Sequence, residues 1–188
     1  MASEFSHAIV ALAMGQAFQR HVVNRRVLLL GVVCSIIPDV DVIGFHYGIQ
    51  YGDVWGHRGL THSILFAALL SGVMVAWWHR LKSPMATAGV VLYFFLCTVS
   101  HGVLDALTNG GLGVAFFSPF DTARYFFGYR PIVVSPIGIG EFFSEDAARV
   151  LASEAVWIWL PSWTVFVVLR VLQKGWAGTR AGDPSQPE

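Results

Sequence analysis

Long apolar runs, separated by short polar or basic segments, dominate this chain. Three runs are long enough, or within a helical turn of long enough, to cross a bilayer, which takes about 20 residues. They cover residues 63–78, 85–107 and 152–172. Two shorter runs, 5–18 and 27–37, precede them, and we expect helices that are tilted, half-inserted or packed inside the bundle. The pattern predicts an all-α fold, a polytopic membrane helical bundle with about five transmembrane or membrane-embedded helices.

A long connection between Gly110 and Arg149 interrupts this pattern. It is rich in Gly, Pro and Phe, and a connection of this length is more often a lid or binding segment than a plain linker. A re-entrant or interfacial segment fits its composition equally well. Glu141 within it is a further candidate general acid or base. We expect one membrane-embedded domain over residues 1–175, and a disordered polar tail over 176–188 because that segment is polar and rich in Gly and Pro.

Composition strengthens the membrane assignment. The chain is 55% hydrophobic and 13% charged, against about 25% charged for soluble domains. Its formal net charge is zero and it has no long basic block, so nothing favours nucleic acid as a partner. Cys34 and Cys97 lie in apolar runs without a CxxC spacing, and buried thiols are the simplest interpretation.

Basic residues follow the ends of alternate helices, which predicts the orientation of the chain. If the runs cross in alternation, one side collects Arg20, Arg25, Arg26, Arg80, Lys82, Arg170, Lys174 and Arg180, and the other collects Arg58, Arg124, Arg130 and Arg149. Lys and Arg near span ends accumulate on the cytoplasmic face. We therefore expect the N-terminus outside and the C-terminus in the cytoplasm.

Seven metal-capable side chains lie at or next to the ends of these apolar runs. They are His7, Asp39, Asp41, His57, His62, His101 and Asp105. Charged groups within a membrane cost roughly 2.5–3.5 kcal/mol each at a helix centre, so a functional role is the default explanation. The same alternation places all seven at the non-cytoplasmic face, and a shared site explains this convergence better than chance.

Two local patterns support such a site. His101 and Asp105 are four residues apart, so both point from one helical face; a His–Asp hydrogen bond that stabilises a buried turn is the alternative. Pro38 is expected to stop the second helix, after which Asp39 and Asp41 face one way if the segment is extended. Each aspartate taken alone could equally be a cap or turn residue.

The segment HRGLTHS, residues 57–63, is the most specific local motif. Gly59 permits a tight turn between two imidazoles, and Thr61 or Ser63 can cap the following helix. Arg58 could bind a phosphate or carboxylate with both arms of its guanidinium. A surface or headgroup-facing arginine is the alternative.

Four histidines and three aspartates, with no cysteine among them, suit zinc, and also manganese or iron. The set is too large for one tetrahedral ion, so we expect two. Two ions about 3.5–4 Å apart can activate water and stabilise the leaving oxygen of a phosphoester. We expect Asp39, Arg58 and Thr61 to take part in catalysis, Arg58 by neutralising phosphate oxygens and Thr61 as a hydrogen-bond partner of the ligands.

The motifs PDVD, HRGLTHS, SHGVLDALTNGG and FFSPF occur in this order. In this the chain resembles the YdjM-like family of LexA-binding inner membrane proteins, which are described as metal-dependent hydrolases. The resemblance covers about residues 5–136. It implies a multi-pass protein of the bacterial inner membrane whose metal ligands are the seven residues above. The family's likeness to zinc-dependent phospholipase C enzymes implies phosphoester hydrolysis.

The leading hypothesis is therefore a metal-dependent hydrolase that opens to the periplasmic or outer face and acts on a phosphoester of a lipid or lipid-linked substrate in the bilayer. A non-enzymatic membrane protein that binds metal structurally, or moves ions or protons, is the first alternative. A scaffold whose histidines only cap helices is the second. The run 64–78 offers almost no polar group beyond Ser71, which disfavours a transport path along it. The oligomeric state is left open.

Overall fold

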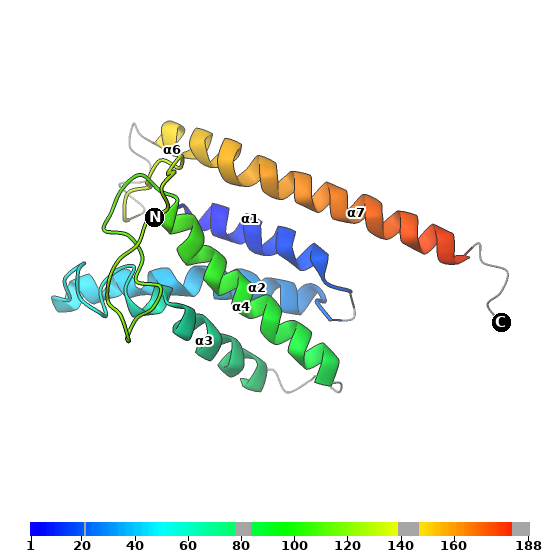
Figure 1. Cartoon of the computed structure of the whole chain (residues 1–188), viewed down its shortest axis with the longest axis horizontal. Helices are drawn as coiled ribbons and strands as arrows, with labels where there is room; N and C mark the ends of the chain where they lie inside the picture. Colours follow the sequence, from blue (N-terminus) through cyan, green and yellow to red (C-terminus); the bar gives the residue numbers. More distant parts are fainter. Residues whose placement is uncertain (21, 78–83, 139–146, 182–188) are drawn as a thin grey trace.

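The computed structural model describes residues 1–20, 22–77, 84–138 and 147–181, and within them it is helical. The α-helices are α1 (Glu4–Met14), α2 (Arg25–Ile36), α3 (Ile64–Trp77), α4 (Pro84–Ala106), α6 (Ala147–Glu154) and α7 (Leu160–Ala181). The 3-10 helices η1 (Gly15–Ala17), η2 (Ile37–Tyr47) and η3 (Leu60–His62) lie between them, and the π-helix η4 (Ala155–Trp159) joins α6 to α7. Figure 1 shows the resulting bundle, with α7 along one side of it.

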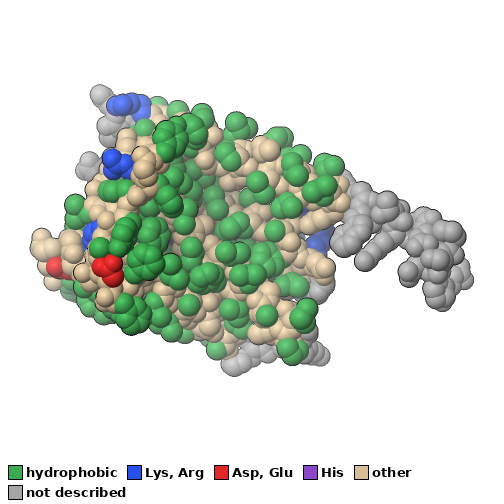
Figure 2. Space-filling model, in the orientation of Figure 1, with side chains coloured by type: hydrophobic (Ala, Val, Ile, Leu, Met, Phe, Trp, Pro, Cys, Tyr) green, Lys and Arg blue, Asp and Glu red, His purple; other side chains and the backbone are tan. Residues whose placement is uncertain are grey.

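Three helical stretches are long and apolar enough to cross a membrane. They are Arg25–Tyr47, Pro84–Ala106 and Ala147–Gln173, and α3 is a shorter apolar helix. The face seen in Figure 2 is largely apolar along the bundle, and the charged side chains visible on it gather towards the two ends. The predicted helical membrane bundle is confirmed.

The second apolar run does not stop at Pro38, and this prediction was wrong. Helix α2 passes directly into η2, where Pro38 occupies the first turn. A proline is tolerated there because its missing N–H would have no partner in a first turn. The chain then continues in the tighter winding to Tyr47, so Asp39 and Asp41 lie on a helix and not on an extended segment.

The centre of the bundle is an apolar core around α4, which packs against α1, α2 and α3. Tyr93 and Phe94 are fully buried there, and the Tyr93 hydroxyl donates to the Ala11 carbonyl at 3.0 Å. Cys34 and Cys97 belong to the same core and are free thiols, as predicted. Close packing in this layer holds the ends of four helices in fixed relative positions.

The last helical stretch changes its winding just before Pro161. Proline lacks the N–H of a regular helical turn and its ring crowds the preceding carbonyl. The wider π-turn η4, immediately upstream, is one way in which a helix accommodates such a defect. Helix α7 then runs to Ala181, beyond the predicted boundary at residue 175. Residues 182–188 lie outside the described part of the chain, so the tail stays a prediction.

The long connection after α4 folds over one end of the bundle, the end where the N-terminus lies (Figure 1). It is held by isolated bridges that pair Thr108 with Ile132 and Val114 with Tyr125. The Ala115 N–H donates to the Arg58 carbonyl at 3.0 Å, which ties the connection to the segment before α3. Glu141, the further candidate acid or base, lies outside the described residues.

Candidate metal centre

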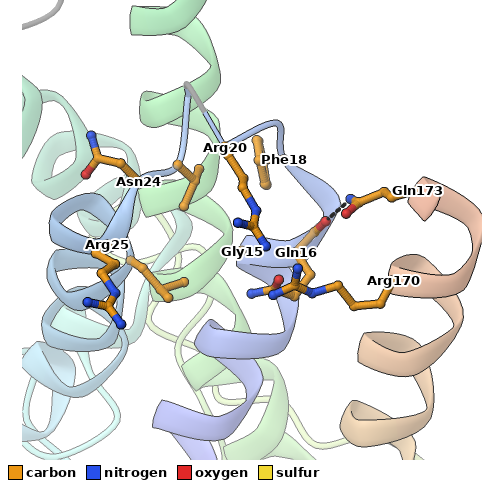
Figure 3. Close-up of a pocket in the computed structure, with 10 residues that line it drawn as sticks. Gly15, Gln16, Phe18, Arg20, Asn24, Arg25, Arg170 and Gln173 are labelled. Carbon is orange, nitrogen blue, oxygen red and sulfur yellow. Dashed lines mark hydrogen bonds between the residues drawn. The ribbon is translucent and has the colours of Figure 1, made fainter. Parts of the chain in front are cut away.

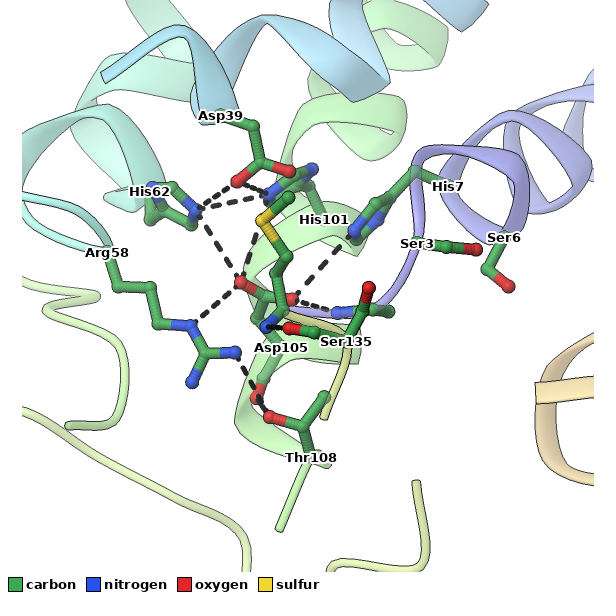
Figure 4. Close-up of polar contacts among 12 residues, drawn as sticks. Ser3, Ser6, His7, Asp39, Arg58, His62, His101, Asp105, Thr108 and Ser135 are labelled. Carbon is green, nitrogen blue, oxygen red and sulfur yellow. Dashed lines mark hydrogen bonds and ion pairs between the residues drawn. The ribbon is translucent and has the colours of Figure 1, made fainter. Parts of the chain in front are cut away.

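The structure brings all seven predicted metal-capable residues to this covered end of the bundle. Their side chains are only 0–6% exposed. Figure 4 shows five of them converging from four parts of the chain: His7 from α1, Asp39 from η2, His62 from η3, and His101 and Asp105 from α4. The predicted convergence of helix ends is therefore present.

Four of these residues, Asp39, His62, His101 and Asp105, form a four-donor group that could hold one metal ion. His101 Nε2 lies 3.1 Å from His62 Nε2 and 3.2 Å from Asp39 Oδ1. Asp105 Oδ2 lies 3.7 Å from His62 Nε2 and 4.0 Å from His101 Nε2, the pair predicted from the spacing of four. Ligands about 2.0–2.1 Å from a tetrahedral zinc are about 3.3 Å apart, so this spacing fits a single ion.

Hydrogen bonds determine which ring nitrogens of this group face inward without a proton. His101 Nδ1 lies 2.7 Å from the Ser35 carbonyl, which can only accept, so Nδ1 carries the hydrogen. His62 Nδ1 lies 3.2 Å from Asp41 Oδ2, which also only accepts. In the neutral rings both Nε2 atoms are therefore bare, and they face each other beside Asp39. Three lone pairs at this distance need a positive charge between them.

The electrostatics of the group favour such a charge. Burial alone lowers the pKa of the His62 imidazole, but the nearby carboxylates of Asp39 and Asp41 more than reverse this and raise it to about 9. Both carboxylate oxygens of Asp39 are buried and lack a hydrogen-bond partner within the described part of the chain. A bound cation would satisfy the same atoms, since buried charges persist only when they are paired or coordinate a metal.

A second group, Asp41, His57 and His62, could also hold an ion. Asp41 Oδ1 lies 2.8 Å from His57 Nδ1, and Asp41 Oδ2 accepts a hydrogen bond of 2.6 Å from the Thr61 hydroxyl. This is also the geometry in which a carboxylate orients metal-binding histidines from behind. His62 belongs to both groups, with Nε2 facing the first and Nδ1 facing the second.

His7 lies beside the four-donor group. Its ring stacks on His101 with centroids 3.7 Å apart, and its Nε2 lies 3.8 Å from Asp105 Oδ1. Neither of its ring nitrogens has a hydrogen-bond partner among the described residues, and His57 Nε2 has none either. These buried, unsatisfied nitrogens exceed what the four-donor group needs, and buried polar atoms of this kind call for an explanation such as an ion or water.

Comparison with known proteins identifies the family of this chain. The model of the YdjM inner membrane protein family matches residues 1–177. The chain belongs to this family. It is also 35% identical over 167 residues to the inner membrane protein YbcI of Escherichia coli (strain K12), covering 86% of this chain and 92% of the relative. No solved structure matches the chain significantly. The YdjM match and the three membrane-length helices identify a multi-pass protein of the inner membrane.

Arg58 of this YdjM-family chain points into the protein and is fully buried, so it is neither a surface arginine nor a headgroup-facing one. Its Nε donates to Asp105 Oδ2 at 2.9 Å, and its two terminal nitrogens donate to the Gly110 carbonyl and the Thr108 hydroxyl at 2.8 and 3.0 Å. The guanidinium thus holds one ligand of the four-donor group (Figure 4). Its predicted contact with a substrate phosphate stays a prediction.

The HRGLTHS segment forms a tight turn that requires Gly59. The left-handed backbone conformation falls on Arg58, with φ of 64°, and not on Gly59. A glycine is required at 59 because a side chain there would collide with backbone oxygens of Val54 and Gly56. Ser63 caps α3 as predicted, its hydroxyl accepting from the Phe66 N–H at 3.0 Å.

Glu154, a fully buried carboxylate at the end of α6, was not among the residues predicted from the sequence. It accepts hydrogen bonds from the Ser3 N–H and the hydroxyls of Ser3 and Ser6, at 2.5, 2.5 and 2.8 Å. It therefore clamps the start of α1, which carries His7, onto the last helical stretch. The available signal was an acidic residue inside the predicted apolar run 152–172, which calls for a buried partner.

Of the three remaining histidines, the structure describes only His46. His46 is exposed on η2. His21 and His79 lie outside the described residues.

Proposed function

We propose that this YdjM-family protein is a membrane-bound metal-dependent hydrolase that cleaves a phosphoester of a lipid or lipid-linked substrate. The observation that carries the proposal is the excess of buried, unpaired ring nitrogens beside a complete four-donor group. A purely structural ion needs the four donors alone, whereas hydrolysis also needs groups that hold and transfer protons. Zinc is the proposed cation, with manganese or iron as alternatives, because every donor is nitrogen or oxygen.

The ion would be held by Asp39, His62, His101 and Asp105. A divalent cation there would lower the pKa of water and stabilise charge that develops on a phosphoester. Two ions, as expected from the number of candidate ligands, require the second group of Asp41, His57 and His62 to bind as well. In the one-ion form, Asp41 instead holds the rings of His57 and His62 in place.

The chain's own residues would contribute orientation and proton transfer. His57 is backed by Asp41 at 2.8 Å, which leaves its buried Nε2 free to take up and return a proton. Thr61 supports the same carboxylate at 2.6 Å. Arg58 neutralises Asp105 in the resting arrangement. A direct contact of Arg58 with a phosphate would require it to give up one of its three protein partners.

A structural metal site is the second candidate function, and one observation favours it. The four donors are at most 6% exposed and come entirely from protein, as in closed structural zinc sites, whereas catalytic sites keep an open position. Ion or proton movement is less well supported. The core below the site is mainly apolar, and the buried hydroxyls of Ser35, Tyr93 and Thr98 donate to backbone carbonyls instead of forming a chain with one another.

Metal analysis of detergent-purified protein, paired with an activity screen over phospholipids and generic phosphoesters, tests the proposal. We expect at least one transition-metal ion per chain, or two if the second group also binds, and turnover that stops on chelation and returns with zinc. His62→Ala should lose both metal and turnover while inserting into the membrane. His46→Ala is the matched control, since His46 is exposed and should keep both.

The other outcomes discriminate the alternatives. Bound metal without hydrolysis of any phosphoester tested, together with a lower melting temperature after chelation, would establish the structural site and reject the hydrolase. Purified protein that neither contains nor takes up a transition metal would reject both. Misfolding of His62→Ala in metal-free and metal-loaded membranes alike would favour the helix-capping scaffold.

A further inference from the structure

A basic cavity lies at the opposite end of the bundle from the candidate metal centre. It has a volume of about 470 Å³ and opens between the end of α1, the start of α2 and α7. Figure 3 shows Arg20 and Arg170 reaching towards Gln16 from two sides, with Arg25 on the first turn of α2. Gln173 closes α7 onto this region by donating to the Gln16 carbonyl at 2.6 Å. We call this space the basic pocket.

The charge of the basic pocket is of one sign. Three arginines line it, and none of the described residues in its lining is Asp or Glu. Among the ion pairs of the described residues, none involves Arg20, Arg25 or Arg170. The Asn24 side chain is already used, since it caps α2 by accepting from two backbone N–H groups. The Arg170 guanidinium lies over the Phe166 ring, 5.4 Å from its centroid. The planar forks of the three guanidinium groups match the oxygens of a phosphate that enters from outside.

An apolar groove adjoins the basic pocket. It measures about 430 Å³, runs between α1 and α7, and shares Gln16 and Leu28 with the pocket. Its further lining includes Ile9, Leu12, Trp163 and Phe166. Within the span Ala147–Gln173, only 6% of an 18-residue apolar stretch is buried inside the protein. This side of the bundle therefore faces lipid.

We propose that the basic pocket and the apolar groove together bind one anionic phospholipid, with its phosphate among Arg20, Arg25 and Arg170 and an acyl chain along the groove. The order of the two spaces matches a phospholipid, whose charged head is followed by a chain that runs into the membrane. Basic pockets between membrane helices on the cytoplasmic side take anionic headgroups. These arginines lie on the side predicted to be cytoplasmic, and the assignment does not depend on hydrolase activity.

The apolar groove favours a lipid over a free anion as the ligand. A soluble phosphate would use the arginines alone and gain nothing from Trp163 or Phe166. Burial of a hydrocarbon chain would add an apolar contribution that grows with chain length. A lipid in this position would also connect α7 to the start of α2, in addition to the existing bond between Gln173 on α7 and Gln16 on η1.

The test uses the full chain in a neutral detergent, titrated with dioleoyl phosphatidylglycerol or dioleoyl phosphatidylcholine. Bound lipid is counted by native mass spectrometry and stability is followed by thermal unfolding. We expect one tightly held phosphatidylglycerol and a higher melting temperature with this lipid than with phosphatidylcholine. The triple variant Arg20→Ala/Arg25→Ala/Arg170→Ala should bind it at least about 10-fold more weakly. Arg26→Ala is the matched control, because Arg26 neighbours Arg25 but does not line the pocket.

Two further experiments distinguish binding of the lipid headgroup from binding of the acyl chain. Inorganic phosphate and glycerophosphoglycerol should each give a much smaller rise in melting temperature than the intact lipid. Ser162→Trp fills the groove and should weaken the binding of phosphatidylglycerol. The rise in melting temperature with inorganic phosphate should stay the same. If the triple variant does not fold, the single variants Arg20→Gln, Arg25→Gln and Arg170→Gln replace it, each with weaker binding expected. The proposal would be overturned if both lipids were retained equally, or if phosphate alone raised the melting temperature as much as the intact lipid. Unchanged lipid binding by the arginine variants would overturn it as well.

Discussion

Charged side chains are buried and paired at one end of this bundle, and exposed at the other. At the end with the candidate metal centre, carboxylates, imidazoles and one guanidinium are buried and contact one another, as Arg58 and Asp105 do at 2.9 Å. At the other end, Arg20 and Arg25 are exposed and pair with no carboxylate among the described residues. The first arrangement is assembled by the chain itself, whereas the second is completed only by something from outside.

The difference follows from burial. A buried ion pair survives because each partner compensates the desolvation of the other, and removing one leaves an uncompensated charge. Exposed arginines carry little such cost, so they can remain available at the membrane surface. Between the two ends, the apolar core around Tyr93 separates the charged layers. Substitutions at the two ends should therefore differ in kind as well as in size.

The largest effect is expected for Asp105→Asn, which leaves the fully buried Arg58 without its carboxylate. Loss of one partner of a buried pair costs about 3–5 kcal/mol, to be measured as the free energy of unfolding in detergent. The double variant Arg58→Met/Asp105→Leu should recover much of that stability but not the metal. If Asp105→Asn lowered the free energy of unfolding no more than Asp53→Asn, a change at an exposed residue, Arg58 and Asp105 would not form a buried ion pair.

Glu154→Gln tests whether the covered end needs its clamp on α1. The change removes the charge that accepts from Ser3 and Ser6, and about 1–3 kcal/mol of stability should be lost. Because His7 is held through this clamp, the variant should also expose the start of α1 to hydrogen exchange while the four-donor group keeps its ion. Unchanged exchange at Ser3 and Ser6 would contradict the clamp.

Asp41→Asn separates orientation from ligation. If Asp41 only orients His57 and His62, the variant should bind the metal about 10–100-fold more weakly with the same number of ions per chain. If Asp41 is a ligand, one ion per chain should disappear. Competition with a chelator of known affinity, followed by metal counting, distinguishes these results.

The smallest effect is expected at the basic end, for Asn24→Ala. Its side chain accepts from the Arg26 and Val27 N–H groups at 3.0 and 3.2 Å, so about 1 kcal/mol of helix capping should be lost. The metal content should not change, because the apolar core separates Asn24 from the four-donor group. A fall in metal content would show that the two ends are coupled.

The sequence was sufficient for those features that depend on local periodicity. Two ligands four apart on one helix must share a face, so His101 and Asp105 were predictable as a pair, and their distance of 4.0 Å confirms it. The convergence of helix ends followed from alternation of the apolar runs. Pro38 was misjudged because a proline that stops one helix can begin the next, here as η2.

Contacts between distant parts of the chain were not predictable in this way. Glu154 meets Ser3 across 151 positions, and no local pattern links them. The direction of Arg58 depends on its left-handed backbone and on Thr108 and Gly110, which the folded connection after α4 supplies. Such contacts arise only once the whole bundle has packed.

The sharing of His62 between the two donor groups has a consequence for protein engineering. One rigid ring presents two nitrogens in different directions, towards Asp39 on one side and Asp41 on the other. In the neutral ring, one nitrogen can donate to Asp41 while the other offers a lone pair towards Asp39. Ionised glutamate only accepts and so could not donate to Asp41, and glutamine is not among the usual zinc ligands. Redesign of the centre must therefore keep an imidazole at position 62 and vary its neighbours.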